Sequence, residues 1–285
     1  MSFASIMVTR FLYFAVISFF GIYPFVTQAW EKPIPQTLLL MGVSAAVPFI
    51  PQSREVTPWE IPFDQSIQRA VQAGNNITQQ QARVLSDITL GISVGLPVTQ
   101  GMLSALNRNP DDLSADHRDW MLYSTVNSFA SNWILTETFK KLFGRKRPYA
   151  QPCEIESDFR CLEGPNTDQD FKSFPSGHTS FAFTGAALTC LHQARLKDQG
   201  LLFSSPWVCP LSIVTASATA FFRVRGNAHW FTDITAGAVV GLLSGFVLGP
   251  ALTGVPPTNG EGASSFVTFG DLKATPPIVT TQFFF

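Results

Sequence analysis

Charged side chains are scarce in this chain. Lys, Arg, Asp and Glu make up 14% of its 285 residues, against roughly 25% in an average soluble domain. The 19 basic and 20 acidic residues give a formal net charge of -1, so the excess of positive charge typical of nucleic-acid-binding proteins is missing. We therefore expect no nucleic-acid partner. Low charge combined with long apolar runs favours a protein in or on a membrane.

Cysteine is also rare, with four residues. Their spacing matches no zinc pattern, so we expect no metal site built on them. In an oxidising compartment an even number of cysteines suggests disulfides, and four cysteines allow three pairings. Cys153 and Cys161 flank a short polar loop, so they can pair easily. Cys190 and Cys209 lie in neighbouring apolar segments, where they either pair or remain buried thiols.

Residues 1–29 predict export of the chain. Arg10 supplies a positive charge, an uncharged stretch comes after it, and Ala29 offers a small residue for cleavage of a signal peptide. The alternative is an uncleaved anchor, because Phe11 to Ala29 is just long enough to span a bilayer. Both alternatives export the rest of the chain. We expect a protein of the cell envelope, with its site facing the extracytoplasmic, periplasmic side.

The remaining hydrophobic pattern predicts an all-α fold, a bundle of about five to six core helices over residues 30–253. An irregular tail, 254–285, is rich in Pro, Gly, Thr and Ser. The apolar segments expected to be helical are Ile88–Leu106, a run ending before Gly144, Gly177–Leu191, Leu201–Phe222 and Ile234–Leu252. Several are long enough to cross a bilayer, and their Gly, Ser, Thr and Asn residues allow close packing of membrane helices. The same residues would suit buried helices of a soluble bundle.

Three clusters of unusual residues fall at the ends of predicted helices. The first is "KKLFGRKRPYA", whose cations could simply complement a helix C-terminus. The second is "PSGH", from Pro175 to His178, which resembles a helix start with free N–H groups able to bind an anion. The third is "FFRVRGNAHWFTD", in which His229 and Asp233 lie four residues apart. On a helix this spacing puts them on one face, where the carboxylate can bind Nδ1 and leave Nε2 as a nucleophile.

Each cluster alone has an ordinary structural explanation, but cations gathered in a charge-poor chain need an anion. A phosphoryl group suits them, since arginines bind its oxygens in forked pairs and lysine adds a point charge. Together the clusters resemble the signature of the phosphatidic acid phosphatase type 2 / haloperoxidase family. Lys140 precedes Arg147-Pro148 by the family spacing, "PSGH" matches fully, and Arg223, His229 and Asp233 match the third block. Phe222 replaces the family's serine, which removes one expected phosphate hydrogen bond.

The resemblance implies a role for each matched residue. His229 would be the nucleophile that forms a phosphohistidine, Asp233 would orient it, and His178 would protonate the leaving alcohol. The residues expected to hold the phosphate are Lys140, Arg147 and Arg223, helped by Ser176 and the Gly177 N–H. No metal or other cofactor is implied, because the cations neutralise the charge. The unmatched cations are predicted to be surface or substrate-headgroup groups: Lys141, Arg145, Lys146 and Arg225.

These expectations support a phosphatase that hydrolyses a phosphomonoester or pyrophosphate, with a phosphorylated lipid as the substrate. Export and low charge motivate the lipid, whereas the motif residues themselves do not identify it. One alternative is a soluble exported acid phosphatase acting on small phosphate esters. A vanadium-dependent haloperoxidase and a non-catalytic phospholipid-binding protein are further alternatives from other functional classes.

Overall fold

A computed structural model describes residues 34–53, 61–73, 77–106, 115–150, 168–196 and 205–254. Within these ranges the chain is helical and has no strand, which confirms the predicted all-α class. The predicted signal peptide or anchor, the pair Cys153 and Cys161, and residues 255–285 of the tail lie outside the described residues. The helices are α2 (Ile34–Ala46), α3 (Pro62–Ala73), α4 (Gln79–Leu106), α5 (Ala115–Phe143), α6 (Gly177–Leu196), α7 (Val208–Arg225), α8 (Phe231–Leu243) and α9 (Gly249–Thr253).

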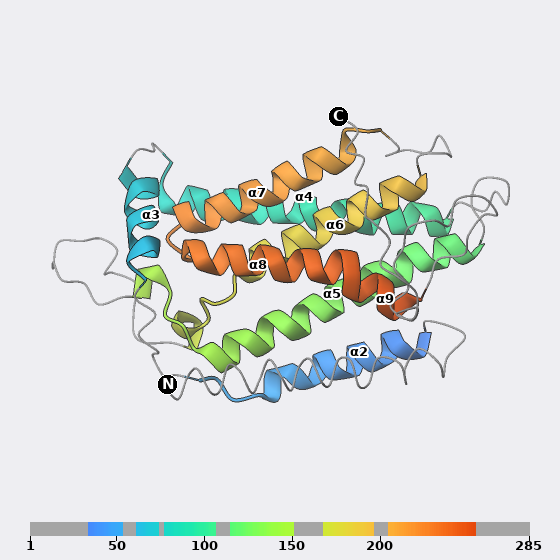
Figure 1. The fold of residues 1–285 in the computed structure, drawn as a ribbon, viewed down its shortest axis with the longest axis horizontal. Helices are drawn as coiled ribbons and strands as arrows, with labels where there is room; N and C mark the ends of the chain where they lie inside the picture. Colours follow the sequence, from blue (N-terminus) through green and yellow to red (C-terminus); the bar gives the residue numbers. More distant parts are fainter. Residues whose placement is uncertain are drawn as a thin grey trace, which may run out of the picture. The chain divides into compact units, whose positions relative to one another are not determined.

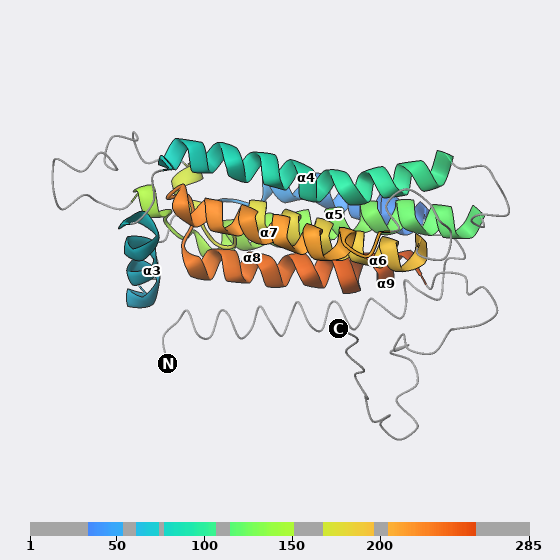
Figure 2. The same ribbon diagram turned by 90° about the horizontal axis from the view of Figure 1, so that it is seen from above.

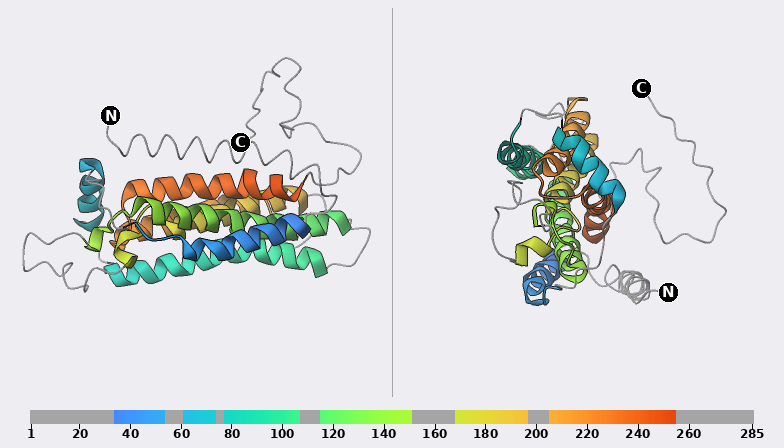
Figure 3. Two further views of the ribbon diagram at one scale, coloured as in Figure 1. Left: turned by 90° about the horizontal axis from the view of Figure 1, so that it is seen from below. Right: turned by 90° about the vertical axis from the view of Figure 1, so that its left-hand side faces the viewer.

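Helix α6 is the centre of the bundle, since it packs against α4, α5, α7 and α8 (Figures 1 and 2). Helix α2 lies along α5, and a π-helical turn, Ser244–Leu248, joins α8 to α9. Helix α3 runs crosswise at the end of the bundle, where it contacts α7 and α8 (Figures 1 and 3). This is the end at which α5 and α7 finish and α6 and α8 begin.

A ridge of glycines on α8 sets the spacing between α8 and α6. Gly237 and Gly241 lie four residues apart and share one face of α8, and Gly245 follows in the π-helical turn. A Cβ added at Gly237 would lie 2.6 Å from the Ser176 carbonyl oxygen, and one at Gly241 would lie 2.3 Å from that of Ser180. The backbones therefore approach too closely for any side chain. This contact fixes the starts of α6 and α8, which carry two of the three motif clusters.

The contact between α4 and α6 depends on a proline and a glycine. Pro97 lies inside α4 and has no N–H, so the carbonyl of Ser93 lacks its usual intrahelical donor. Gly185 of α6 lies against this carbonyl, and a Cβ there would be 2.1 Å from the oxygen. The proline thus opens the hydrogen-bond ladder of α4 where α6 comes closest.

Polar and apolar side chains are distributed in the opposite way to those of a typical soluble protein, with polar side chains inside the bundle and large apolar ones on its surface. Many fully buried side chains are small and polar, including Ser128 and Thr184, each 0% exposed. Large apolar side chains point outward instead, as at Leu38 and Val214, both 63% exposed.

Within the described ranges one continuous helix, Phe231–Thr253, is long and apolar enough to cross a membrane. Cys190 and Cys209 form a disulfide between α6 and α7, which decides between the two alternatives for that pair.

Candidate active site

The motif residues from three separate stretches meet at one end of the bundle. Lys140 lies in the last turn of α5, His178 in the first turn of α6, and Arg223 in the last turn of α7. Arg147 follows α5, and His229 lies in the short loop that connects α7 to α8. Burial lowers the pKa of His229 well below its usual value of 6.5, and all four other groups lower it further. The sequence prediction that these residues gather at helix ends therefore agrees with the structure.

His229 is held as a neutral imidazole with a defined proton position. Its side chain is almost wholly buried, with the residue 1% exposed. Nδ1 lies 2.8 Å from the carbonyl oxygen of Ser173, and because a carbonyl can only accept, Nδ1 is the nitrogen that carries the hydrogen. Nε2 then keeps its lone pair, which is the form that a nucleophilic histidine needs. Ser173 was not singled out from the sequence, although it stands directly before the "FPSGH" stretch.

Asp233 lies near His229 without the direct hydrogen bond that the four-residue spacing predicts. Its Oδ2 is 3.7 Å from Nδ1 of His229. The prediction of one shared helix face is wrong, because α8 begins at Phe231 and His229 precedes it. Oδ2 instead accepts from the backbone N–H of Trp230 at 2.9 Å and from the hydroxyl of Ser173 at 2.5 Å. Asp233 thus caps α8 and binds the residue whose carbonyl holds His229.

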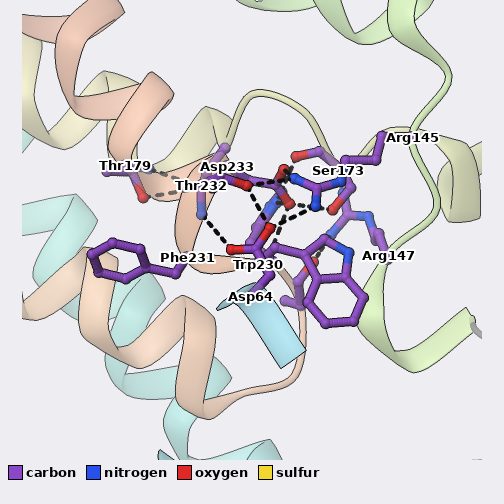
Figure 4. A network of polar contacts seen from close by, with 12 residues as sticks. Asp64, Arg145, Arg147, Ser173, Thr179, Trp230, Phe231, Thr232 and Asp233 are labelled. Carbon is purple, nitrogen blue, oxygen red and sulfur yellow. Dashed lines mark hydrogen bonds and ion pairs between the residues drawn. The ribbon is translucent and has the colours of Figure 1, made fainter. Parts of the chain in front are cut away.

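Arg145 is buried beneath the site, which corrects its prediction as a surface or headgroup cation. The side chain is 3% exposed and lies between two carboxylates (Figure 4). Its NH1 is 2.5 Å from Oδ1 of Asp233 and 2.7 Å from the hydroxyl of Thr232. Its NH2 is 2.7 Å from Oδ2 of Asp64. Because two hydrogen-bonded carboxylates already neutralise the Arg145 guanidinium, it is not available to bind a substrate anion.

Asp64, on the crosswise helix α3, completes this buried network. It is 1% exposed. Oδ1 accepts from the backbone N–H of Thr232 at 2.9 Å, and Oδ2 accepts from the Thr232 hydroxyl at 2.6 Å. A carboxylate at a helix N-terminus satisfies a free N–H and interacts favourably with the helix dipole. Asp64 therefore fixes the start of α8 from another helix, a contact between residues 168 positions apart that no local pattern signals.

The start of α6 forms a cradle of backbone and cationic groups. Ser176 is fully buried, and its Oγ accepts from the backbone N–H of Thr179 at 3.4 Å, so it serves as the N-cap. A Cβ added to Gly177 would lie 2.8 Å from Nζ of Lys140. A side chain at this position would displace the ammonium group from the helix start. Lys140 also contacts Glu137 at 2.5 Å, and burial lowers its pKa.

Arg147 and Arg223 supply the planar cations of the site. The Nε of Arg147 donates to the carbonyl of Gln169 at 3.0 Å, and burial lowers the pKa of this guanidinium. Arg223 is 8% exposed, and burial followed by the charge of Arg147 lowers its pKa to about 10. The Nε of Arg223 is buried and has no hydrogen-bond partner among the described residues. Crowded, poorly compensated cations of this kind would be stabilised by a bound anion.

His178 is partly exposed at the rim of the site, with 33% of its side chain accessible. Its Nε2 lies 2.8 Å from Oδ1 of Asp87, a residue of α4 that the sequence analysis did not single out. Burial, followed by the charge of Arg223, lowers the pKa of His178 to about 4. A histidine in this position can exchange a proton with a group bound between it and the cations.

The remaining unmatched cations serve the scaffold. Lys141, 8% exposed, donates to the carbonyls of Pro48 and Ile50 at 2.6 and 2.7 Å. Arg225, 5% exposed, donates to Oε1 of Gln72 at 2.7 Å. The prediction of these two as surface or headgroup groups is therefore wrong. Lys146 lies over the ring of Phe171, 5.6 Å from its centroid.

Phe222, which stands where the family has serine, packs edge-on against Phe221 with ring centroids 5.6 Å apart. An aromatic ring cannot supply the hydrogen bond of a hydroxyl. This position therefore has no side-chain hydrogen-bond donor.

Fold and site define an all-helical protein with two histidines and a group of cations at one bundle end, a set of groups suited to a phosphoryl substrate. Residues 121–252, which include every matched motif residue, match the family model described as the PAP2 superfamily. This match confirms the resemblance that the motifs predicted.

Two curated relatives and one solved structure illustrate the similarity. A lipid A 1-phosphatase of Porphyromonas gingivalis is 38% identical over 73 residues, 26% of this chain and 15% of that protein. A putative phosphatidate phosphatase of Drosophila melanogaster is 28% identical over 159 residues, 46% of this chain and 42% of that protein. The chain thus spans less than half the length of these relatives. A PAP2-type phosphatidylglycerolphosphate phosphatase of Bacillus subtilis is 22% identical, with a TM-score of 0.47 over 77% of this chain and 94% of that one.

Proposed function

We propose that the protein is a metal-independent phosphatase that hydrolyses a phosphomonoester or pyrophosphate of a lipid through a phosphohistidine intermediate. One observation carries the proposal. His229 holds its proton on Nδ1, bonded to the Ser173 carbonyl, while Lys140, Arg147 and Arg223 surround the imidazole closely enough to lower its pKa. A neutral nucleophile inside a cluster of cations suits attack on an anionic phosphoryl group.

In the first step, Nε2 of His229 would attack phosphorus and form the P–N bond. The bond from phosphorus to the leaving oxygen breaks, and its electron pair is taken up by that oxygen, which receives a proton from His178. In the second step, His178 would take a proton from water as the water oxygen attacks phosphorus. The P–N electron pair then returns to Nε2, phosphate leaves, and both histidines regain their starting forms.

The cations would act on the charge that spreads over the phosphoryl oxygens in both steps. Arg147 and Arg223 offer forked donors, and Lys140 adds a point charge beside the start of α6. The Gly177 N–H and the positive end of the helix dipole add to this field. The contacts around Asp233 and Ser173 would keep the His229 ring in one orientation throughout. Such preorganised donors need no metal ion to neutralise the phosphate.

A lipid substrate is supported by the surface and by the names of the relatives. Exposed side chains such as Leu39, Ile92 and Phe246 cover the bundle, while small polar residues lie inside. Exposed apolar surface is typical of contact with a membrane or a partner protein, and small polar residues between helices are typical of membrane bundles. The two curated relatives carry names of phosphatases that act on lipids. We therefore propose that the protein lies in a membrane of the cell envelope; the export predicted from residues 1–29 supports a site end that faces the extracytoplasmic side.

The catalytic proposal can be tested with radiolabelled phosphatidic acid and detergent-solubilised protein. The wild type should release phosphate without added metal and in the presence of a chelator. A rapid acid-free quench should trap a labelled protein that is stable in base and loses its label in acid, as a phosphohistidine does. His229→Ala should lack both the label and the release of phosphate. Full activity of that variant would refute the proposed nucleophile.

The membrane proposal has its own test, which also addresses the alternative of a soluble exported phosphatase. Cells that express the protein should retain it in the membrane fraction after osmotic shock and after a high-salt wash. Only detergent should release it. Recovery of active protein in the osmotic-shock fluid would favour the soluble alternative and small phosphate esters as substrates.

A further inference from the structure

Asp87 joins the site from a helix that carries none of the motif residues. It lies on α4, before the segment that matches the superfamily, and 91 positions from the histidine that it contacts. Its Oδ1 is 2.8 Å from Nε2 of His178 and 3.9 Å from NH1 of Arg223. The Asp87 side chain is 62% exposed. It is therefore a carboxylate at the rim, placed between the candidate proton donor and one of the phosphate-binding cations.

We propose that Asp87 is a positioning residue for the proton donor: its carboxylate holds a proton on Nε2 of His178 and orients that N–H until the leaving oxygen of the substrate replaces it. The inference rests on the proposed function and adds a residue to it. The ring nitrogen that faces Asp87 is the one that then faces the leaving group. A carboxylate beside a histidine stabilises the imidazolium form in this way.

The surroundings of His178 explain why such a partner is needed. The groups that face it are Arg223 from α7, Lys140 from α5, Asp87 from α4 and, across the site, His229. Burial and the two cations lower the pKa of His178, whereas the hydrogen bond and charge of Asp87 raise it. Asp87 is the only acidic group in this set. Without it, nothing among these neighbours would favour a protonated His178.

The turn of α4 that carries Asp87 is itself held against the site. Arg83, one helical turn earlier, donates from Nε to the carbonyl of Gly226 at 2.8 Å. Its guanidinium also lies over the ring of Tyr149, 5.3 Å from the centroid. These contacts connect α4 to the loop after α7 and to the segment after α5. Asp87 is thus presented to His178 from a fixed position, although its own side chain reaches solvent.

Two substrates whose leaving groups differ in basicity distinguish a positioning role of Asp87 from a merely structural role. A nitrophenolate leaves without a proton, whereas an alkoxide needs one, so a weakened proton donor slows only the second reaction. The comparison uses kcat/KM, which reports the formation of the phosphohistidine and not the later step in which His178 activates water. In Asp87→Asn we expect kcat/KM for phosphatidic acid at pH 7 to fall about ten-fold or more, since a tenfold change corresponds to about one pKa unit in the donor. The kcat/KM for p-nitrophenyl phosphate should change less than about two-fold, and the alkaline limb of the phosphatidic acid profile should move to lower pH.

Asp119→Asn is the matched control, because Asp119 is an exposed carboxylate near the opposite end of α5 from Lys140. It should leave both rates and the pH profile unchanged. Equal loss with the two substrates in Asp87→Asn, or no loss with either, would overturn the proposal. If the wild type hydrolyses neither substrate, the proposed function itself fails, and this outcome is distinct from an active wild type with an unaffected Asp87→Asn variant.

Discussion

Replacing Gly241 by alanine tests whether the glycine ridge of α8 positions the active site. The added Cβ would lie 2.3 Å from the Ser180 carbonyl oxygen, 2.8 Å from the Cβ of Phe183 and 3.0 Å from the backbone nitrogen of Thr184. Ordinary van der Waals contact requires 3.4–4 Å. Two of these neighbours are backbone atoms, which cannot rotate aside. Helices α6 and α8 would have to separate by roughly 1 Å, a typical overpacking strain.

The expected magnitudes follow from that separation. Overpacking costs about 1–3 kcal/mol, and the higher helix propensity of alanine offsets up to about 1 kcal/mol of this. Because the added Cβ would meet backbone atoms, the cost falls in the upper part of this range, about 2–3 kcal/mol. We therefore expect a net loss of about 1–2 kcal/mol and a fall in Tm of several degrees. Helix α6 carries His178 and α8 carries Asp233, so the same shift displaces the two sides of the site. A misplacement of about 1 Å can reduce kcat by up to about a hundredfold.

Thermal unfolding in detergent and steady-state kinetics on phosphatidic acid would measure both effects. Gly95→Ala is the control, because nothing lies within 4 Å of a Cβ added at this position of α4. That variant should keep full activity and gain up to about 1 kcal/mol from helix propensity. If Gly241→Ala behaves like Gly95→Ala in both Tm and kcat, the close contact does not hold the site in place and the reasoning is refuted.

Two further predictions concern charge. Arg145→Met should destabilise the protein by about 3–5 kcal/mol, because it leaves the buried carboxylates of Asp64 and Asp233 without their cation. Arg145→Lys should retain part of the stability. Denaturant unfolding would measure both, and Met and Lys variants as stable as the wild type would contradict the buried network. Proton uptake should accompany binding of inorganic phosphate near pH 6, since burial lowers the pKa of both His178 and His229 and leaves them neutral in the free protein, while a bound anion favours the charged form of His178. Calorimetry in buffers of different ionisation enthalpy would count the protons, and heats that are independent of the buffer would exclude the uptake.

The sign of the pH effect on stability follows from the same shifts. A histidine whose pKa is lower in the folded than in the unfolded protein stabilises the folded state above the unfolded value of about 6.5. This contribution is lost as the pH falls from 6.5 towards the folded value, which is about 4 for His178. The protein should therefore lose stability in this window, and bound phosphate should oppose the loss.

The sequence predicted the helical class and the meeting of the motif residues because both depend on local patterns. Apolar runs mark helices, and Gly144 ends α5 with a φ of 53°, as its position after the run predicts. Gly177 and His178 stand at the start of α6 because Ser176 caps that helix. The helix ends of a bundle gather at its two ends. Three motif clusters that each lie at a helix end can therefore meet at the same end of the bundle.

What the sequence could not reveal is which charged side chains are buried. Asp64 and Asp87 lie on polar helix faces and look like ordinary solvated carboxylates, yet one is fully buried and the other contacts His178. Arg145 stands two residues before Arg147 and looks equally available to a phosphate, but its partners come from α3 and α8. Such pairings depend on tertiary contacts between distant segments, for which a single sequence carries no periodic signal.

Asp64 and Asp87 both precede the segment that matches the superfamily model, residues 121–252, yet both contact the candidate site. A fragment trimmed to residues 121–252 would contain every motif residue and would still look complete by pattern. It would nevertheless lack the carboxylate that fixes the start of α8 and the one that contacts His178. The motif residues alone therefore do not include every side chain on which the candidate site depends, because α3 and α4 each supply a carboxylate to it.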